Sequence, residues 1–208
     1  MAMREARKRF EWRGAETEYR DVLASAHGEE LRWLISRERI HDTVTGKTVT
    51  RSIGRHPGVC VIVPFLGDDR IVLVRQYRYP IDGELWELPA GTLHGREADG
   101  RVIATETPEA CAARELLEES GYTAARWNKV AEWYAMPGGD DQLVHLFFAR
   151  GLAAGERALD EGEVIDEARP FATAELERMI ARGEIRDAKS LVGLFHALGR
   201  RPEGVRIA

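Results

Sequence analysis

The chain has 208 residues, a formal net charge of −5 at pH 7, and 44% hydrophobic and 31% charged residues. This length suits one domain with an added N-terminal element, and it can bury a substantial core. The negative balance argues against a nucleic-acid-binding surface, and an anionic substrate would need local positive charge or a metal ion.

The apolar pattern disfavours two further classes. No apolar run approaches the ~20 residues that are needed to cross a bilayer, and the basic start lacks the apolar segment of a signal peptide. We therefore expect a cytoplasmic protein without a membrane partner, in which Cys60 and Cys111 are buried free thiols.

The first part of the chain predicts a small antiparallel sheet. Residues 1–30 are charged and weakly periodic. Residues 31–40 and 48–53 flank a turn at residues 41–47 and predict a hairpin. Because an exposed strand edge is a template for pairing, we expect residues 1–56 to be N-terminal strands that form a homodimer.

Two apolar runs, residues 59–65 and 71–77, predict a buried hairpin. Two arginines and two tyrosines gather at its end: Arg75, Tyr77, Arg78 and Tyr79. These side chains either clamp phosphate and stack on a base or keep an edge strand soluble. Residues 84–91 then predict a short strand and a sharp turn, in which Pro89 and Gly91 leave the carbonyl of Ala90 projecting.

Residues 107–120 predict a helix, with Thr107 as N-cap, Pro108 at the first position and Gly121 as a left-handed stop. Three acids share one stripe at spacing i, i+3 and i+4: Glu115, Glu118 and Glu119. Four residues fall on the side expected to pack against a sheet: Ala110, Ala113, Leu116 and Leu117.

Three carboxylates crowded this closely repel one another unless a cation lies among them. Oxygen-only ligands suit hard divalent ions, so Glu115, Glu118 and Glu119 predict a Mg²⁺ or Mn²⁺ site. The alternative is a solvated acidic helix face. Arg114 lies beside the stripe and is expected to pair with Glu106.

After this helix, residues 128–134 and 143–149 predict two strands. Residues 158–171 are an acidic, strand-like run, and a helix is predicted over residues 173–182 with Thr173 as N-cap. A second helix is predicted within residues 183–198.

From Gly100 the spacing reads G-x5-E-x7-R-E-L-x-E-E-x-G-Y, which resembles the signature of the Nudix hydrolases. Those enzymes cleave nucleoside diphosphates that are linked to another group. Tyr122 stands where the signature usually has an aliphatic residue. The phrase ELWELPAG at residues 84–91 is typical of the ADP-ribose pyrophosphatase branch, which residues 183–198 also resemble. The resemblance implies an α/β/α sandwich around a mixed sheet over residues 57–208.

The resemblance also implies site residues. The Ala90 carbonyl becomes a metal ligand beside the three helix glutamates, and Glu106 and Arg114 take structural roles. In this branch the signature glycine is usually the one that ends PAG, here Gly91. Residues 92–105 therefore read as an insertion, expected to be a surface loop near the metal site. Four residues are candidates for substrate contacts: Arg55, Arg78, Trp33 and Tyr77.

A loop at residues 136–142 follows, and branch members carry a catalytic glutamate on such a loop. By counting, that position is Gln142, whose amide cannot take a proton from water. Either Asp140 or Asp141 substitutes as general base, with Asp141 favoured as the nearer, or these acids merely solvate a turn.

The resemblance implies hydrolysis of a nucleoside diphosphate-linked substrate, with ADP-ribose cleaved to AMP and ribose 5-phosphate as the first expectation. Divalent ions at the helix acids would neutralise the diphosphate oxygens and acidify a bound water. Another nucleotide sugar is the alternative substrate. A Nudix-like sensor that binds such a ligand without cleaving it is the alternative from another class, and three clustered acids argue against it.

Overall fold

A computed structural model describes residues 9–25, 28–99, 101–157, 159 and 164–199. The chain divides into two compact units. The first, which we call the N-terminal unit, comprises Met1–Pro57, His94–Thr105 and Tyr134–Leu143. The second, the helix unit, comprises Gly58–Leu93, Glu106–Trp133 and Val144–Ala208. Each is described by itself.

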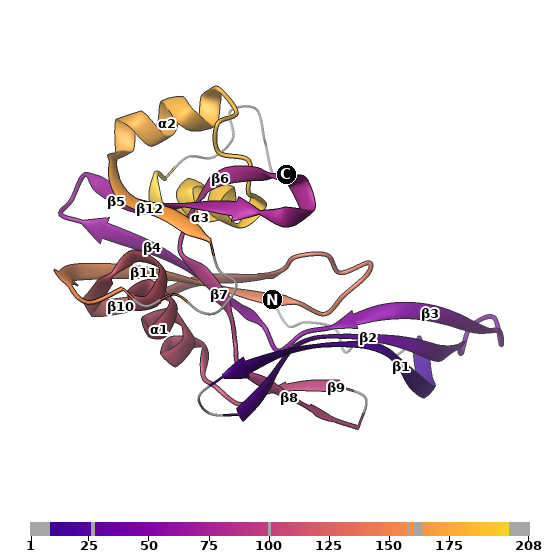
Figure 1. Cartoon of the computed structure of the whole chain (residues 1–208). Coiled ribbons are helices and arrows are strands. Elements are labelled where there is room, and N and C mark those ends of the chain that lie inside the picture. The colour runs from indigo at the N-terminus through magenta and orange to yellow at the C-terminus, as the bar shows by residue number, and fades with distance from the viewer. Residues whose placement is uncertain (1–8, 26–27, 100, 158, 160–163, 200–208) are drawn as a thin grey trace. The chain divides into compact units, whose positions relative to one another are not determined.

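The helix unit is built on a seven-stranded mixed sheet with the order β10-β11-β4-β5-β12, to which β6 and β7 add through β5 and β4 (Figure 1). Its strands have these bounds: β4 Val59–Leu66, β5 Arg70–Arg78, β6 Gly83–Glu87, β7 Ala90–Thr92, β10 Tyr122–Tyr134, β11 Leu143–Ala154 and β12 Ile165–Ala172. A short 3₁₀ helix, η1, spans Tyr79–Ile81. β11 runs parallel to β4, whereas β12 is antiparallel to β5.

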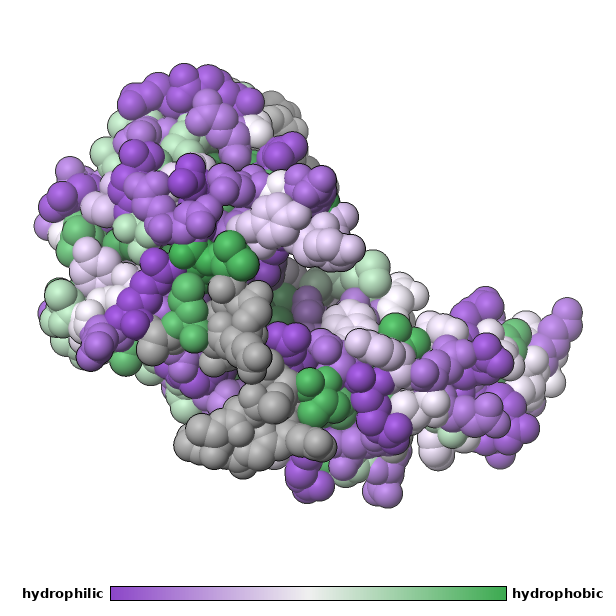
Figure 2. Space-filling model, in the orientation of Figure 1, coloured by the Kyte–Doolittle hydropathy of each residue, from purple (hydrophilic) through white to green (hydrophobic). Residues whose placement is uncertain are grey.

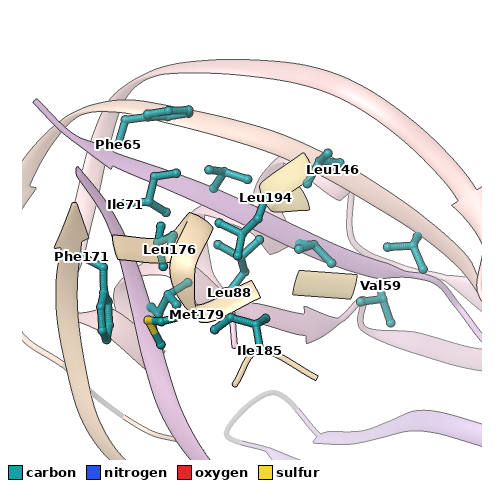
Figure 3. Packing of buried hydrophobic residues seen from close by; sticks show 14 residues of the cluster. Val59, Phe65, Ile71, Leu88, Leu146, Phe171, Leu176, Met179, Ile185 and Leu194 are labelled. Atoms are coloured by element: carbon teal, nitrogen blue, oxygen red, sulfur yellow. The ribbon is translucent and has the colours of Figure 1, made fainter. Parts of the chain in front are cut away.

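Three helices cover this sheet: α1 Pro108–Ser120, α2 Thr173–Ala181 and α3 Ala188–Ala197. Alternate residues of β4 point to opposite faces, as the pleat of a strand requires. Val61 and Val63 pack in one core cluster with Leu194 of α3 (Figure 3). Cys60 and Ile62 pack in another cluster with residues of α1. The expected α/β/α sandwich around a mixed sheet is therefore confirmed.

β4 and β5 pair with each other only next to their turn, at Phe65↔Ile71 and Leu66↔Arg70. Farther along, β4 pairs with β7 and β5 pairs with β6, while β12 pairs with β5 along most of its length. The predicted buried hairpin thus opens, and its two arms lie in the interior of the sheet. Cys60 and Cys111 are both buried and free, as expected.

The N-terminal unit contains a three-stranded antiparallel sheet of β1 Phe10–Ser25, β2 Gly28–Asp42 and β3 Thr48–Arg55. The hairpin of β2 and β3 was predicted. β1 was not, because charged residues are spread along it and it lacks a clear alternation. Its backbone pairs with β2 along nearly its whole length, with three register shifts.

The structure corrects the prediction that residues 92–105 form a surface loop. β8 Gly95–Ala98 and β9 Arg101–Ala104 form a hairpin in the N-terminal unit. It packs on β2 so closely that a Cβ at Gly95 would lie 2.9 Å from the Leu31 carbonyl oxygen, and Arg20 binds Glu97 at 2.6 Å. Gly100, where the signature spacing was counted from, lies outside the described residues.

The C-terminal elements also differ from the prediction in their ends. The N-cap of α2 is Ala172, not Thr173, and it makes no side-chain capping bond. α3 begins after Asp187, whose carboxylate accepts a hydrogen bond from the backbone of Ser190. Residues 158 and 160–163 of the predicted acidic strand lie outside the described part. The surface over α2 that faces the viewer in Figure 2 is largely hydrophilic.

In the described part of the chain, no helix has the length and apolar character to span a membrane.

Candidate active site

Helix α1 has the ends that its sequence predicts. The hydroxyl of Thr107 accepts a hydrogen bond from the Ala110 backbone at 3.2 Å, and Pro108 opens the helix. Gly121 ends it with a φ of 71°, in the left-handed region that glycine adopts without strain. These two caps set where the three acids lie along the helix.

The buried face of α1 is the acidic one, which corrects the sequence prediction. Glu115 and Glu119 are 5% and 1% exposed, whereas Ala110 and Ala113 are exposed. Leu116 is buried as predicted. A charged carboxylate is strongly disfavoured in a dry environment unless donors or cations compensate it. The sheet must therefore supply partners to Glu115 and Glu119.

Strand β7 supplies a backbone donor to Glu119 and space for Glu115. The backbone N–H of Ala90 donates to Glu119 Oε2 at 2.9 Å. Gly91 leaves room for the other acid, since a Cβ there would lie 1.8 Å from Glu115 Oε1. The turn at residues 89–91 thus does more than present a carbonyl. Its backbone donates to Glu119 and leaves space for Glu115.

Arg114 joins the acids of the stripe. It donates to Glu106 from Nε and Nη2 at 3.2 and 3.1 Å, the ion pair expected from the sequence. Its Nη1 also donates to Glu115 at 2.7 Å and to Glu118 at 2.9 Å. Burial alone would lower the pKa of Arg114, but the bonds to Glu106 and the charge of Glu115 hold it well above its usual value.

A second ion pair, with a buried carboxylate, lies on β5 and β6. Arg78 donates from Nε and Nη2 to the two oxygens of Glu87 at 2.9 and 2.7 Å, and the Glu87 side chain is 2% exposed. Sequence reasoning missed Glu87. Its only signal was a charged residue between apolar neighbours in ELWELPAG. Arg78 is thus held in a fixed orientation by a bidentate bond.

The four side chains at the end of β5 are not gathered as one clamp. Tyr77 donates its hydroxyl to Asp82 at 2.7 Å, and Tyr79 is 84% exposed on η1. The guanidinium carbon of Arg75 lies 5.9 Å from the centroid of the Trp86 ring. Arg78 is the residue of this group whose position is fixed by a buried partner.

The other predicted residues belong to the N-terminal unit. Arg55 donates to Glu38 and to Asp141. Trp33 lies edge-on to His56, with ring centroids 5.3 Å apart. Burial lowers the pKa of His56 to about 4, although the charge of Asp141 acts in the opposite direction. Sequence reasoning missed Glu38, a buried acid of β2.

The residues of the helix unit fit a hard divalent cation by their donors. In the described conformation, no three acidic, histidine or cysteine side chains of the described residues converge on a metal position. The acids of α1 are instead held by Arg114 and by the Ala90 N–H. The proposed ligands are nevertheless all oxygens, and two of the carboxylates are buried. Oxygen ligands of this kind suit a hard divalent cation.

Comparison with known families agrees with this geometry. The family model described as NUDIX domain matches residues 54–192. The chain belongs to the Nudix hydrolase family. Divalent metal ions are general in this family, which is consistent with the oxygen donors of α1.

Two relatives carry the name ADP-ribose pyrophosphatase. The one from Bacillus subtilis is 35% identical over 147 residues, which cover 70% of this chain and 74% of that protein. The one from Mycobacterium tuberculosis is 35% identical over 151 residues, 72% of this chain and 69% of that protein. A GDP-mannose pyrophosphatase from Klebsiella pneumoniae is also 35% identical, over 66% of this chain and 69% of its own.

The fold has a solved counterpart in a crystal structure of an ADP compounds hydrolase. The two align with a TM-score of 0.61 over 89% of this chain and 93% of that chain, at 17% sequence identity. At this identity the match supports the shared Nudix fold.

Proposed function

We propose that this Nudix hydrolase cleaves ADP-ribose to AMP and ribose 5-phosphate with Mg²⁺ or Mn²⁺. The observation that carries the proposal is the burial of Glu115 and Glu119 against the Ala90–Gly91 backbone. A merely structural helix would turn these acids to solvent, because burying charge costs several kcal/mol per ion. Relatives named ADP-ribose pyrophosphatase support the choice of substrate.

A divalent ion bound here would supply Lewis-acid chemistry, which neutralises diphosphate oxygens and lowers the pKa of water. Glu115, Glu118, Glu119 and the Ala90 carbonyl would hold it. Arg114 keeps the acids in place by its bonds to Glu106 and to the stripe, so its role is positional. These assignments account for every charged residue of the α1 signature.

Substrate contacts are proposed for four side chains. Arg78, fixed by Glu87, would offer its guanidinium to phosphate, and Tyr77 and Trp33 would offer ring faces to a base or ribose. Arg55 is assigned to the same set, although Glu38 and Asp141 already bind it. Asp140 or Asp141 is proposed as the general base in place of a glutamate at position 142.

We propose further that the active form is a cytoplasmic homodimer made through residues 1–56, with residues 57–208 as the hydrolase domain. β1 is at the edge of its sheet, and Trp12 and Tyr19 are 53% and 55% exposed along it. An unpaired edge with exposed aromatic residues is suited to bind a second copy.

GDP-mannose is the second candidate substrate, because GDP-mannose pyrophosphatases of Salmonella are 38% identical over 59% of this chain. The test is to incubate the protein with ADP-ribose or GDP-mannose and magnesium, and to identify the products by mass. Release of AMP from ADP-ribose at the higher kcat/KM supports the proposal. Binding of either compound without cleavage would identify a sensor instead.

A further inference from the structure

The loop at residues 134–143 is attached to the end of β3 in the N-terminal unit. The backbone N–H of Gly54 donates to Gly139 at 2.9 Å, and that of Asp141 donates back to Gly54 at 3.3 Å. Gly54 and Asp140 form an isolated parallel bridge. The loop thus extends the sheet by a short strand-like segment. Gly54 permits the approach, since a Cβ there would lie 2.7 Å from the Trp33 ring and 3.0 Å from Asp140 Cβ.

Side chains reinforce this attachment through one guanidinium. Arg55 Nε and Nη2 donate to the two oxygens of Glu38, each at 2.8 Å, and its Nη1 donates to Asp141 Oδ2 at 2.9 Å. The second oxygen of Asp141 accepts from the His56 backbone at 2.9 Å. Both carboxylate oxygens of Asp141 are therefore bound by residues at the end of β3.

The Glu38 end of this network is buried. Glu38 is 2% exposed and also accepts from the Ser36 hydroxyl at 2.8 Å. Burial alone would lower the pKa of Arg55, but the hydrogen bonds to Asp141 and Glu38 raise it. Arg55 is thus fixed by a buried bidentate partner, and its third nitrogen, Nη1, donates to the loop.

Asp140 is arranged differently from Asp141. Its Oδ1 accepts from the backbone of Gln142 at 3.1 Å, a bond within the loop that stabilises a turn. That bond needs an acceptor oxygen but no negative charge, because the donor is a neutral amide. An ion pair with Arg55 does need the charge of Asp141.

We propose that Glu38, Arg55 and Asp141 form a clamp that fixes the position of the loop on β3. Asp141 and Arg55 are then positioning residues, and the clamp does not rest on the proposed hydrolase function. Through Glu38 and Arg55, the clamp connects β2 to the loop.

The experiment compares Asp140→Asn with Asp141→Asn in the full chain, with Asp68→Asn on an exposed turn as the matched control. Amide hydrogen exchange at Gly54 and Asp141 reports the clamp without any need for activity. We expect Asp141→Asn to accelerate this exchange at least about tenfold, because asparagine cannot accept the Arg55 ion pair. Asp140→Asn keeps an acceptor for Gln142 and is expected to leave the exchange unchanged, as is the control.

Glu38→Gln is expected to accelerate the exchange as Asp141→Asn does, because each change removes an ion-pair partner of Arg55. The two changes together are expected to be less than additive because they share Arg55.

Two results would overturn the proposal. Unchanged exchange in Asp141→Asn would show that no clamp exists. Acceleration in Asp140→Asn equal to that in Asp141→Asn would show that the Arg55 ion pair is not what holds the loop.

Discussion

The carboxylate of Glu119 accepts a hydrogen bond from the backbone N–H of Ala90 at 2.9 Å, although Glu119 is 1% exposed. A neutral amide donor satisfies one lone pair of the carboxylate, and the charge of Glu119 also interacts with Arg78. The same helix adds Glu115 at 5% exposure. This pair of buried acids on one side of α1 is the arrangement that supports the proposed metal-dependent function.

Glu119→Gln separates the charge of this residue from its hydrogen bond. Glutamine offers the same acceptor to the Ala90 N–H, so the fold is expected to persist with a small change in the free energy of unfolding. Loss of the charge is expected to lower kcat for ADP-ribose by about 10²-fold or more, the scale of removing one electrostatic group from an active site. Steady-state kinetics with urea denaturation measure both. An unfolded variant would mean that the acid is structural.

Gly91→Ala tests the space that β7 leaves for Glu115. The added Cβ would lie 1.8 Å from Glu115 Oε1, so the carboxylate must move. Because the end of a flexible side chain gives way, we expect a cost of about 1 kcal/mol in stability but a severe loss of kcat. Gly83→Ala is the matched control, since its nearest neighbour is 3.7 Å away. Equal kinetics in the two variants would contradict the prediction.

Removal of metal is expected to abolish hydrolysis, because the proposed ligands are all oxygens and hold divalent ions reversibly. Addition of Mg²⁺ is also expected to raise Tm, since a cation relieves the repulsion among Glu115, Glu118 and Glu119. In Glu119→Gln the rise in Tm is expected to be smaller. Activity that survives exhaustive chelation would rule out the metal site.

The sequence predicted much of this site because its signals are local. The caps of α1 depend on Thr107 and Gly121 alone, and the pair of Arg114 and Glu106 depends on their placement around one helix start. The motif was therefore readable without any tertiary information.

The buried face of α1 was predicted wrongly for a tertiary reason. Hydrophobic periodicity turns acids outward, but here the backbone of Ala90 and Gly91, distant in sequence, offers them a donor and a space. Glu38 and Glu87 were missed for the same reason, since each is buried only because an arginine on a neighbouring strand binds it. β1 was missed because edge strands carry charged residues on both faces.

Because β1 lies at the edge of its sheet, we predict that substitutions of its exposed aromatic residues weaken the proposed dimer. Trp12 and Tyr19 are more than half exposed on this strand. If they bury apolar area against a partner chain, Tyr19→Lys is expected to raise the dimer dissociation constant at least about tenfold, by roughly 1.4 kcal/mol of lost interaction. Sedimentation velocity over a concentration series measures this. A fully active monomer at assay concentrations would refute the dimer.

The buried imidazole of His56 predicts a loss of stability in mild acid. Its pKa falls from 6.5 to about 4 because burial disfavours the charged ring. Above pH 6.5 the ring is neutral in both the folded and unfolded states, so its contribution is fully present. As pH drops toward 4, the unfolded chain takes up the proton first and is favoured, by on the order of 3 kcal/mol in total. Below about pH 4 the folded state also binds the proton, and this loss ends.

Urea denaturation between pH 7 and pH 4 measures the effect as a difference between the parent and His56→Gln. Glutamine does not titrate, so the variant is expected to lose less stability than the parent over this range. His196→Gln, a change of the same kind at an exposed helix position, is expected to follow the parent. Carboxylates titrate in the same range, but they are present in all three proteins and cancel in the comparison. Parallel curves for the parent and His56→Gln would show that His56 takes up its proton equally easily in the folded and unfolded states.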